Sequence, residues 1–585
     1  MKRVYRLSRS VCVCLGLLIW GSLPSPLRAQ NIQVTSATPP AAAQGTTNLD
    51  VVIGGSGFKR DAQAVFVLSG TNSTDGVMVN STTFNGRTQL TANITIADTA
   101  TIGSFDVLVY SSGRTGKGTG LFSVTAKGTF TSCGTLGTPS GFTLVTTLNY
   151  INESGAPQYQ PAFGLNISVR PAMITNGVQS RDILVAAVGT GNDNGKMEFF
   201  FLDPATGDVL DGQRLLSGGP IQPHITVVLD PNLTGAIGAI GGDLNGDGVP
   251  DFAANRNDSN QITVVLGHMD ANGILSYGSP ITFDPVPSSP PLYGGNAPAM
   301  GDLDGELGDE LAVGVPGKKS RGKKSYGSVL IYKLDGSGIS LVQVVNDPLV
   351  DFSDGFGGGL AIVDVTGDGV PDLIVAASNA TAGGASGAGI VFVYPSPLTS
   401  SSFYTLSEGI SGDNLGFQVG AGTLSSSTTT DVIATTSWRS SVTSFRASIF
   451  SGPITGNRTA SNFDFLPSPG LAEGWATSLD VGDMTGDGRA EVLVGAPNAS
   501  NSTSCNNSSS IGAAHLYLSN PSDPAQPALT VLQPPTVDPN FGGFGFGVGV
   551  VPYSLGNPSL LLVGENGRDL GGVTSAGQVY VYRKD

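Results

Sequence analysis

Charged side chains, cysteines and long hydrophobic runs are all scarce in this sequence. Asp, Glu, Lys and Arg make up 13% of the 585 residues, about half of the roughly 25% in an average globular protein. After the apolar run 11–20, no segment approaches the roughly 20 apolar residues of a membrane-spanning helix, so we expect no transmembrane segment. Two of the four cysteines lie in the first 29 residues, which leaves Cys133 and Cys505. These can pair or stay as free or reactive thiols, but one pair excludes a disulfide framework.

The few charges are mostly negative, with 45 Asp and Glu against 29 Lys and Arg and a formal net charge of −16. An acidic protein is a poor partner for nucleic acid, whose phosphates are also negative, but it suits divalent cations. Residues 1–29 resemble a secretory signal peptide, because basic residues from Lys2 to Arg9 precede the apolar run. With cleavage near Ala29, we predict an exported protein that is secreted, extracellular or held at the cell surface.

Glycine is abundant, at 83 residues, and several glycines lie in acidic turns. The oxygen-bearing residues of segment 243–251 are Asp243, Asn245, Asp247 and Asp251 at positions 1, 3, 5 and 9, with the carbonyl of Val249 at position 7. Ca²⁺ takes six to eight oxygen ligands at short range, so a loop with this spacing can wrap one ion. A single match could be an ordinary acidic turn. The pattern returns, however, at 302–310, 364–372 and 483–491.

An EF-hand is the main alternative for these loops. It needs a bidentate Glu at position 12 and a helix after the loop. Position 12 is instead occupied by Ala254, Val313, Val375 and Val494. A short apolar run follows each loop, which is typical of a buried strand. We therefore predict strand-loop-strand cation sites.

Residues 31–127 alternate between apolar and polar side chains in several short segments separated by Gly-, Asn- and Ser-rich turns. These segments are 50–53, 64–68, 89–96, 105–110 and 121–124. Their rhythm predicts a small antiparallel β-sandwich. Thr38-Pro39-Pro40, the run from Ile53 to Phe58 and the closing Phe122-Ser123-Val124 resemble the IPT/TIG family, which implies an immunoglobulin-like fold. Residues 128–140 are predicted to be a linker.

From 141 to 585 the sequence repeats with a period of about sixty residues. Each unit has a Gly/Phe-rich opening, a first strand, a turn, a buried second strand, a loop, a third strand and a more polar fourth strand. Four strands in each of seven units predict an all-β, seven-bladed β-propeller. The seventh unit stops after its third strand. Segment 142–150 is left over before the first unit, so we predict that it closes the ring as the missing fourth strand, beside 577–583.

The Phe-Gly openings, the acidic loops and Val494-Gly495-Ala496-Pro497 resemble the FG-GAP repeats of integrin α-subunit propellers. The resemblance implies Ca²⁺ at about four loops that join first and second strands. The implied ligands, by loop, are Asp243, Asn245, Asp247, Val249 and Asp251; Asp302, Asp304, Glu306 and Glu310; Asp364, Thr366, Asp368, Val370 and Asp372; and Asp483, Thr485, Asp487, Arg489 and Glu491. Val249, Val370 and Arg489 stand at position 7, where the backbone carbonyl is the ligand.

The sequence also departs from the FG-GAP pattern. The first, fifth and seventh units lack the carboxylates, so no metal is assigned to them. Loop 302–310 has Leu307 where a glycine is expected. The integrin resemblance carries no membrane-signalling role here, since no transmembrane helix is found.

Two functions remain open. The first is an exported interaction or adhesion protein, with Ca²⁺ stabilising the propeller and an extracellular protein or glycan as partner. The second is a secreted propeller enzyme acting on polysaccharide. No catalytic motif surrounds His224, His268 or His515, and most spaced carboxylates belong to the acidic loops, so we expect no enzyme. The basic run 318–324 is either a solvated loop tip or a contact for an anionic partner.

Overall fold

The structure is a computed structural model that describes residues 32–125 and 141–585 with gaps. The main gaps are 44–48, 150–165, 189–195, 211–224, 229–235, 286–297, 437–444, 468–473, 500–510, 536–542 and 568–576. The predicted signal peptide 1–29, the linker 128–140, Cys133, Cys505 and His224 all lie outside the described residues. The described residues form strands and turns and no helix. The chain divides into two units, Met1–Thr129 and Phe130–Asp585.

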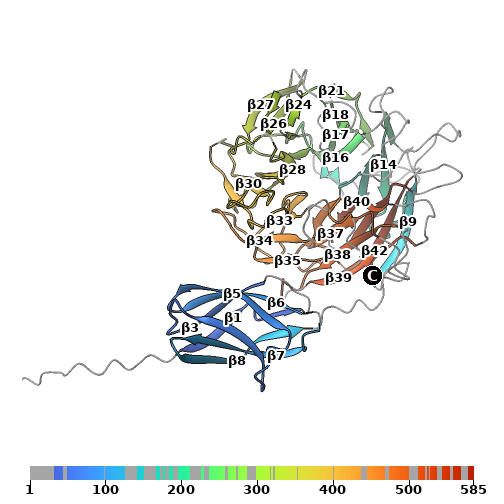
Figure 1. Ribbon diagram of the computed structural model, residues 1–585. Helices are drawn as coiled ribbons and strands as arrows, with labels where there is room; N and C mark the ends of the chain where they lie inside the picture. The colour runs from blue at the N-terminus through green and yellow to red at the C-terminus, as the bar shows by residue number, and fades with distance from the viewer. Residues whose placement is uncertain are drawn as a thin grey trace, which may run out of the picture. The chain divides into compact units, whose positions relative to one another are not determined.

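The N-terminal unit has two four-stranded sheets that share one hydrophobic core (Figure 1). The first sheet contains, in spatial order, β1 (Gln33–Thr38), β3 (Leu49–Ser56), β6 (Gln89–Ile96) and β5 (Val77–Gly86). The second contains β2 (Ala41–Ala43), β8 (Arg114–Thr125), β7 (Gly103–Ser111) and β4 (Gln63–Leu68). Buried and less buried residues alternate along β6, as the sequence pattern predicts. Phe66 and Phe122 meet edge to face in the core, with ring centroids 5.1 Å apart.

All five strand segments predicted for this unit lie within β3, β4, β6, β7 and β8. The predicted segments do not include β1, β2 or β5. In β5 the alternation of buried and exposed residues is interrupted by a register shift between Val79 and Ser81. Strand β2 pairs in parallel with β8, whereas β1 pairs with β3 in the other sheet. The chain therefore changes sheets at Pro39 and Pro40, where proline cannot donate a ladder hydrogen bond.

The C-terminal unit contains seven antiparallel four-stranded sheets among its described residues. Sheets 1 and 2 are β10 (Asn166–Arg170), β13 (Ile183–Val188), β14 (Lys196–Leu202), β15 (Ile225–Val228); and β16 (Ala236–Gly242), β17 (Asp251–Arg256), β18 (Ile262–Val265), β21 (Ile281–Phe283). Sheets 3 and 4 are β22 (Ala299–Gly301), β23 (Glu310–Val315), β26 (Ser328–Asp335), β27 (Gly338–Asn346); and β28 (Phe356–Val363), β29 (Asp372–Ala377), β30 (Ile390–Tyr394), β31 (Tyr404–Leu406).

Sheets 5 and 6 are β32 (Val419–Gly422), β33 (Asp431–Thr435), β34 (Ala447–Phe450), β35 (Phe463–Phe465); and β36 (Leu479–Gly482), β37 (Glu491–Ala496), β38 (Ala513–Leu518), β39 (Ala528–Leu532). Sheet 7 is β40 (Phe544–Val551), β41 (Leu560–Glu565), β42 (Gln578–Lys584) and β9 (Phe142–Asn149). Three small hairpins complete the unit: β11 (Ile174–Thr175) with β12 (Val178–Gln179), β19 (Gly267–Met269) with β20 (Leu275–Tyr277), and β24 (Lys318–Ser320) with β25 (Lys323–Ser325).

Sheet 7 takes its outer strand from the other end of the unit. Figure 1 shows β9, in cyan, beside β42, in red, and Val579 is paired with Leu148. This is the pairing that the sequence predicts for segment 142–150. It covers an edge of β42 that would otherwise present unpaired backbone groups.

The seven sheets pack in a closed cycle. The first strand of each sheet contacts that of the next, and β40 of sheet 7 contacts β10 of sheet 1. Seven hydrophobic clusters each join two neighbouring sheets, including sheets 7 and 1. In β29, for example, Leu373 packs toward sheet 3 and Ile374 toward sheet 5. A second strand buried on both faces is continuously apolar, which explains the unbroken apolar run after each acidic loop.

Two glycines mark where neighbouring sheets approach most closely. A Cβ on Gly314 of β23 would lie 2.0 Å from the carbonyl oxygen of Gly357, and one on Gly495 of β37 would lie 1.9 Å from that of Gly545. No side chain fits in that space. The glycine within each Val-Gly-x-Pro segment is therefore required by backbone contact with the next sheet.

Candidate metal-binding loops

Each acidic loop joins the first and second strands of one sheet. Loop 243–251 connects β16 to β17, loop 302–310 connects β22 to β23, loop 364–372 connects β28 to β29, and loop 483–491 connects β36 to β37. The ninth residue of each loop begins the second strand. Position 12, where an EF-hand would carry its glutamate on a helix, lies inside that strand.

In loop 364–372 the backbone holds the carboxylates in place. Gly367 and Gly369 have φ angles of 79° and 91°, a region that residues with a Cβ rarely adopt. The chain folds back so that Asp364 accepts hydrogen bonds from the N–H groups of Gly367 (2.7 Å) and Gly369 (2.9 Å). Asp368 accepts one from Val370 (3.0 Å). Amide donors therefore position these carboxylates without neutralising their charge.

Loops 243–251 and 483–491 repeat this arrangement. Their glycines at positions 4 and 6 are Gly246, Gly248, Gly486 and Gly488, with φ angles between 71° and 81°. The first carboxylate of each loop accepts the N–H of position 6, at 2.7 Å for Asp243 and 2.9 Å for Asp483. The carboxylate at position 5 accepts the N–H of position 7, at 2.8 Å for Asp247 and 2.9 Å for Asp487. Three of the four loops thus share one backbone geometry.

The side chains at position 7 take no part in these loops. Val249 is buried. The guanidinium of Arg489 donates to the carbonyl of Ser425 in the neighbouring sheet, at 2.7 Å. Position 7 is therefore suited to contribute only through its backbone, as the sequence reading assumed for Val249, Val370 and Arg489.

The last acid of each loop is buried and ties the loop to the sheet. These residues are Asp251, Glu310, Asp372 and Glu491. Each accepts an N–H from near the start of its own loop, for instance Asn245 to Asp251 (3.2 Å) and Met484 to Glu491 (2.5 Å). Outside loop 302–310, its other oxygen accepts the N–H of a residue just beyond the third strand. These residues are Gly267, Ser396 and Ser519. Position 9 therefore has a structural role in addition to any metal binding.

Asp431 shows that this structural role does not require a metal site. It is fully buried at the ninth position of the corresponding turn in sheet 5, whose earlier positions carry Thr and Ser. Its two oxygens accept N–H groups from Ser425 and from Gly452, the latter at 2.8 Å. The sequence reading passed over Asp431 because it lacks acidic neighbours. Its position immediately before a buried strand was the available signal.

Burial and like charge raise the pKa of these last acids. Burial, together with the nearby Asp247 and Asp243, raises the pKa of Asp251 to about 7. Burial also raises the pKa values of Asp372 and Glu491. A carboxylate in such surroundings is stabilised by an adjacent cation. No described ion pair supplies one in loops 243–251, 364–372 or 483–491, so the chemistry of these three oxygen-rich loops fits a divalent cation.

Loop 302–310 differs from the other three. Its left-handed glycines are Gly305 and Gly308, at positions 4 and 7, because Leu307 takes position 6. Oxygens of Asp302, Asp304 and Glu310 lie within 4.8 Å of one another. The ammonium group of Lys333, on β26, lies among them, 2.8 Å from Asp304, 3.0 Å from Glu306 and 3.4 Å from Glu310. The sequence reading missed Lys333, which is 23 residues beyond the loop's last acid.

The pKa values of this cluster reflect the ion pairs. The carboxylate of Asp304 raises the pKa of Lys333. Partial burial acts to raise the pKa of Asp304, but the hydrogen bond and charge of Lys333 outweigh it and the pKa is lowered. Burial keeps the pKa of Glu310 above its usual value. The shifts of Lys333 and Asp304 favour a charged lysine held by a carboxylate, whereas burial disfavours the charged form of Glu310.

Other candidate residues do not form a site with these loops. His268 lies on β19, in the small hairpin β19–β20. His515 is fully buried in β38 of sheet 6, and burial lowers its pKa to about 3. The two histidines do not share a site. Residues of the basic run form the hairpin β24–β25.

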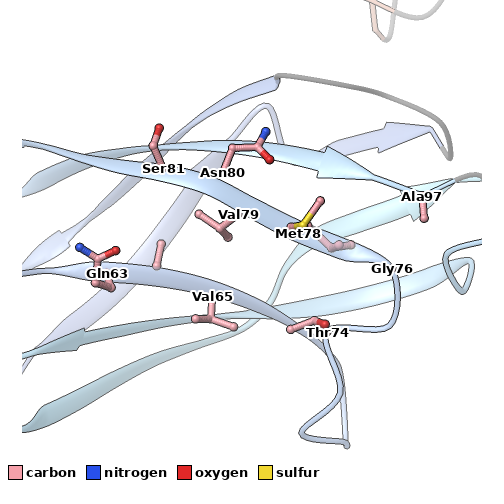
Figure 2. Close-up of a pocket in the computed structure, with 11 residues that line it drawn as sticks. Gln63, Val65, Thr74, Gly76, Met78, Val79, Asn80, Ser81 and Ala97 are labelled. Atoms are coloured by element: carbon pink, nitrogen blue, oxygen red, sulfur yellow. The ribbon is translucent and has the colours of Figure 1, made fainter.

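The N-terminal unit has a groove of about 560 Å³ between the edge strands β4 and β5. Figure 2 shows Val65 on one strand opposite Val79 and Met78 on the other. None of the lining side chains is ionisable. The groove therefore offers no acid or base for catalysis.

Comparison with known proteins identifies the repeats. The FG-GAP repeat family matches residues 356–394 and 475–517, which contain loops 364–372 and 483–491 together with the strands around them. The chain contains FG-GAP repeats.

Over its whole length, the chain has only a weak similarity to a solved structure. A structural genomics protein of unknown function from Bacteroides thetaiotaomicron VPI-5482 is 11% identical, covers 76% of this chain and 91% of its own, and has a TM-score of 0.22. A likeness at this level says nothing about function. No curated protein matches the chain. Among the described residues, none forms a helix long and apolar enough to cross a membrane.

Proposed function

We propose that residues 141–585 form a seven-bladed FG-GAP β-propeller and that residues 31–127 form an IPT/TIG-like immunoglobulin fold. Support for the propeller comes from seven four-stranded sheets whose first strands contact one another in a closed cycle. The two-sheet core of the N-terminal unit supports the second part. A closed ring leaves no exposed sheet edge at its joint and gives a rigid platform for loops.

In this proposal Ca²⁺ binds the acidic loops and stabilises the propeller. The observation that carries it is the geometry shared by loops 243–251, 364–372 and 483–491, in which backbone N–H groups orient the carboxylates at positions 1 and 5 in the same way. A bound divalent cation would offset the repulsion between these carboxylates. Extracellular modules of this kind bind Ca²⁺ with dissociation constants of roughly 10⁻⁴–10⁻³ M.

The protein then acts as an exported interaction or adhesion module with a protein or glycan partner. The FG-GAP repeats support an interaction role, and the signal-like segment 1–29 supports export. We assign the protein no catalytic activity, because the carboxylate clusters that can be recognised belong to the acidic loops. Hydrolysis of a defined polysaccharide by the purified chain, lost on substitution of a pair of its acids, would overturn that assignment.

The main test is thermal unfolding of the full chain in millimolar Ca²⁺ and in chelator. The melting temperature should fall on chelation. The variant Asp364→Thr/Asp368→Ser gives loop 364–372 the residue types of the sheet 5 turn, and it should bind one Ca²⁺ fewer by equilibrium dialysis. Ser427→Ala in sheet 5 is the matched control and should leave the count unchanged. Identical melting curves in Ca²⁺ and chelator would refute the calcium role.

A second experiment addresses the partner. The full chain is applied to an array of defined glycans with Ca²⁺ and with chelator. Calcium-dependent retention on a glycan class that the Asp364→Thr/Asp368→Ser variant loses would support a lectin-like role. Retention that is equal in both conditions would separate ligand binding from the calcium loops.

A further inference from the structure

Lys333 lies where a metal ion would lie in loop 302–310. Its ammonium group contacts one carboxylate oxygen from each of Asp304, Glu306 and Glu310. Its side chain is only 19% exposed, and that of Glu310 only 3%. A calcium ion binds oxygens at about 2.3–2.6 Å, so oxygens on opposite sides of the ion lie about 5 Å apart. The oxygens of Asp302, Asp304 and Glu310, within 4.8 Å of one another, match that spacing.

The position of Lys333 can be compared across sheets by strand register. It follows Tyr332, which pairs with Leu311 of the second strand. The equivalent residues in the other sheets with acidic loops are Leu266, Pro395 and Leu518. None of these is charged, and the described carboxylates of their loops form no ion pair. Lys333 is thus a difference specific to the sheet whose loop departs from the common geometry.

Lys333 also replaces a backbone contact. In sheets 2, 4 and 6, the second oxygen of the last acid accepts an N–H from just beyond the third strand. In sheet 3 that strand, β26, continues to Asp335 in its pairing with β27. The Glu310 oxygen that lacks a hydrogen-bond donor, Oε1, is the one 3.4 Å from the ammonium of Lys333.

We propose that Lys333 is a built-in counter-ion that takes the place of calcium in loop 302–310, so that the protein has three calcium sites and one metal-independent loop. This inference rests on the proposed calcium role of the other three loops. It lowers the expected number of calcium sites from about four to three. The residues Asp302, Asp304, Glu306 and Glu310 would then form a calcium site only after Lys333 is removed.

Lys333 would exclude calcium because its ammonium group occupies the carboxylate oxygens, and not because it lowers the total negative charge of the loop. The loop has five acids, so with the one lysine it still carries a larger formal negative charge than the three acids of loop 364–372. The tethered ammonium, however, already binds oxygens of three implied ligands, and an ion would have to displace it. An attached group competes at a high effective concentration, whereas such loops bind calcium only at roughly 10⁻⁴–10⁻³ M.

The arrangement also affects the adjacent calcium loop. The N–H of Asp309 donates to the carbonyl of Asp243 (2.8 Å), and the N–H of Asp243 donates to the carboxylate of Asp309 (2.7 Å). Asp243 is the first implied ligand of loop 243–251. A loop held by Lys333 at every calcium concentration would therefore keep its neighbour's first ligand in place when calcium is absent.

The test counts bound calcium on the full chain by equilibrium dialysis with ⁴⁵Ca²⁺. Wild type should bind three ions and Lys333→Leu four, because leucine is the residue found in sheets 2 and 6. Lys333→Met, which keeps the length of the side chain, repeats the test if the leucine variant fails to fold. Lys333→Arg retains the cation and should bind three. Arg583→Leu is the matched control, since Arg583 has the equivalent position in sheet 7, which has no acidic loop.

Different outcomes separate this inference from the proposed function. Four ions on wild type, or no added ion on both Lys333→Leu and Lys333→Met, would overturn the inference. No ion on wild type would overturn the calcium role of the other loops, while a single ion gained by Lys333→Leu would still support the role of Lys333. In chelator, Lys333→Leu should melt at a lower temperature than wild type, and calcium should reduce or abolish this difference.

Discussion

Loops 302–310 and 364–372 lie on consecutive sheets and share a sequence pattern, yet they balance negative charge in different ways. In the first, the chain supplies Lys333. In the second, the equivalent residue is Pro395, and the described carboxylates are held by hydrogen bonds without a cation. Under the proposed function, loop 364–372 depends on ions from the medium, whereas loop 302–310 does not. The difference lies at one position, which is Lys333 on β26 and Pro395 just beyond β30.

The same contrast appears where the chain enters sheets 4 and 5. Asp354, before sheet 4, is fully buried near Asp347 and Asp351. Asp413, at the equivalent position before sheet 5, is buried against Arg446, with a separation of 2.6 Å. By register, Ile390 stands in sheet 4 where sheet 5 has Arg446. Here too, one buried acid has a cation from the chain and the other has none.

The largest effect is expected from removing the buried cation at sheet 5. Arg446 is 7% exposed and also pairs with Glu408 and Asp464. Arg446→Met leaves three carboxylates without their counter-ion, which should lower the free energy of unfolding by about 3–5 kcal/mol. Urea denaturation measures the loss. Arg458→Met, which removes an arginine that bonds only backbone carbonyls, is the control. A loss of similar size in both variants would contradict this account.

A smaller effect is expected when the last acid is removed from the turn of sheet 5, which has no other acidic residue. Asp431→Ala leaves two N–H groups without their acceptor, at about 1–3 kcal/mol for each that stays buried and unpaired. The loss should be the same in calcium and in chelator. Asp372→Ala should lose the hydrogen bonds from three N–H groups and the Thr366 hydroxyl and, in addition, one bound ion. If the loss in Asp431→Ala depended on calcium, sheet 5 would have an unrecognised metal site.

Asp354, which is buried without a cation from the described residues, should make the free energy of unfolding depend on pH. Burial, then the charges of Asp347 and Asp351, raise the pKa of Asp354 to about 7. Because this value exceeds that of the unfolded chain, the stabilising contribution is complete below about pH 4 and is lost as the pH rises through about 7. Asp354→Asn should therefore be more stable than wild type at pH 8, by about 1–3 kcal/mol. The exposed Asp523→Asn is the control, and equal pH profiles for Asp354→Asn and wild type would contradict the prediction.

The smallest effect is expected at position 7 of loop 483–491. The side chain of Arg489 bonds the carbonyl of Ser425 and not the loop's own carboxylates. Arg489→Ala should cost about 0.5–1.5 kcal/mol, the usual net value of one hydrogen bond, and leave the number of bound calcium ions unchanged. Loss of an ion would mean that the side chain, and not the backbone, positions the site.

Much of the architecture follows from local sequence. Apolar runs after each acidic loop predicted buried second strands, and β17, β23, β29 and β37 lie there. Paired glycines predicted tight loops, and Gly367 and Gly369 have the left-handed conformation that such loops need. These predictions succeed because strand burial and turn geometry depend on residues that are close together in the chain.

The tertiary structure alone decided which loop has its own cation and which backbone groups hold the buried acids. Lys333 reaches Glu310 because β26 pairs with β23, and Asp431 receives the N–H of Gly452 because β34 pairs with β33. Those partners are separated by 23 and 21 residues. An acidic loop pattern by itself cannot specify these partners. The charge balance of a carboxylate depends on which residues the register of the neighbouring strand places beside it.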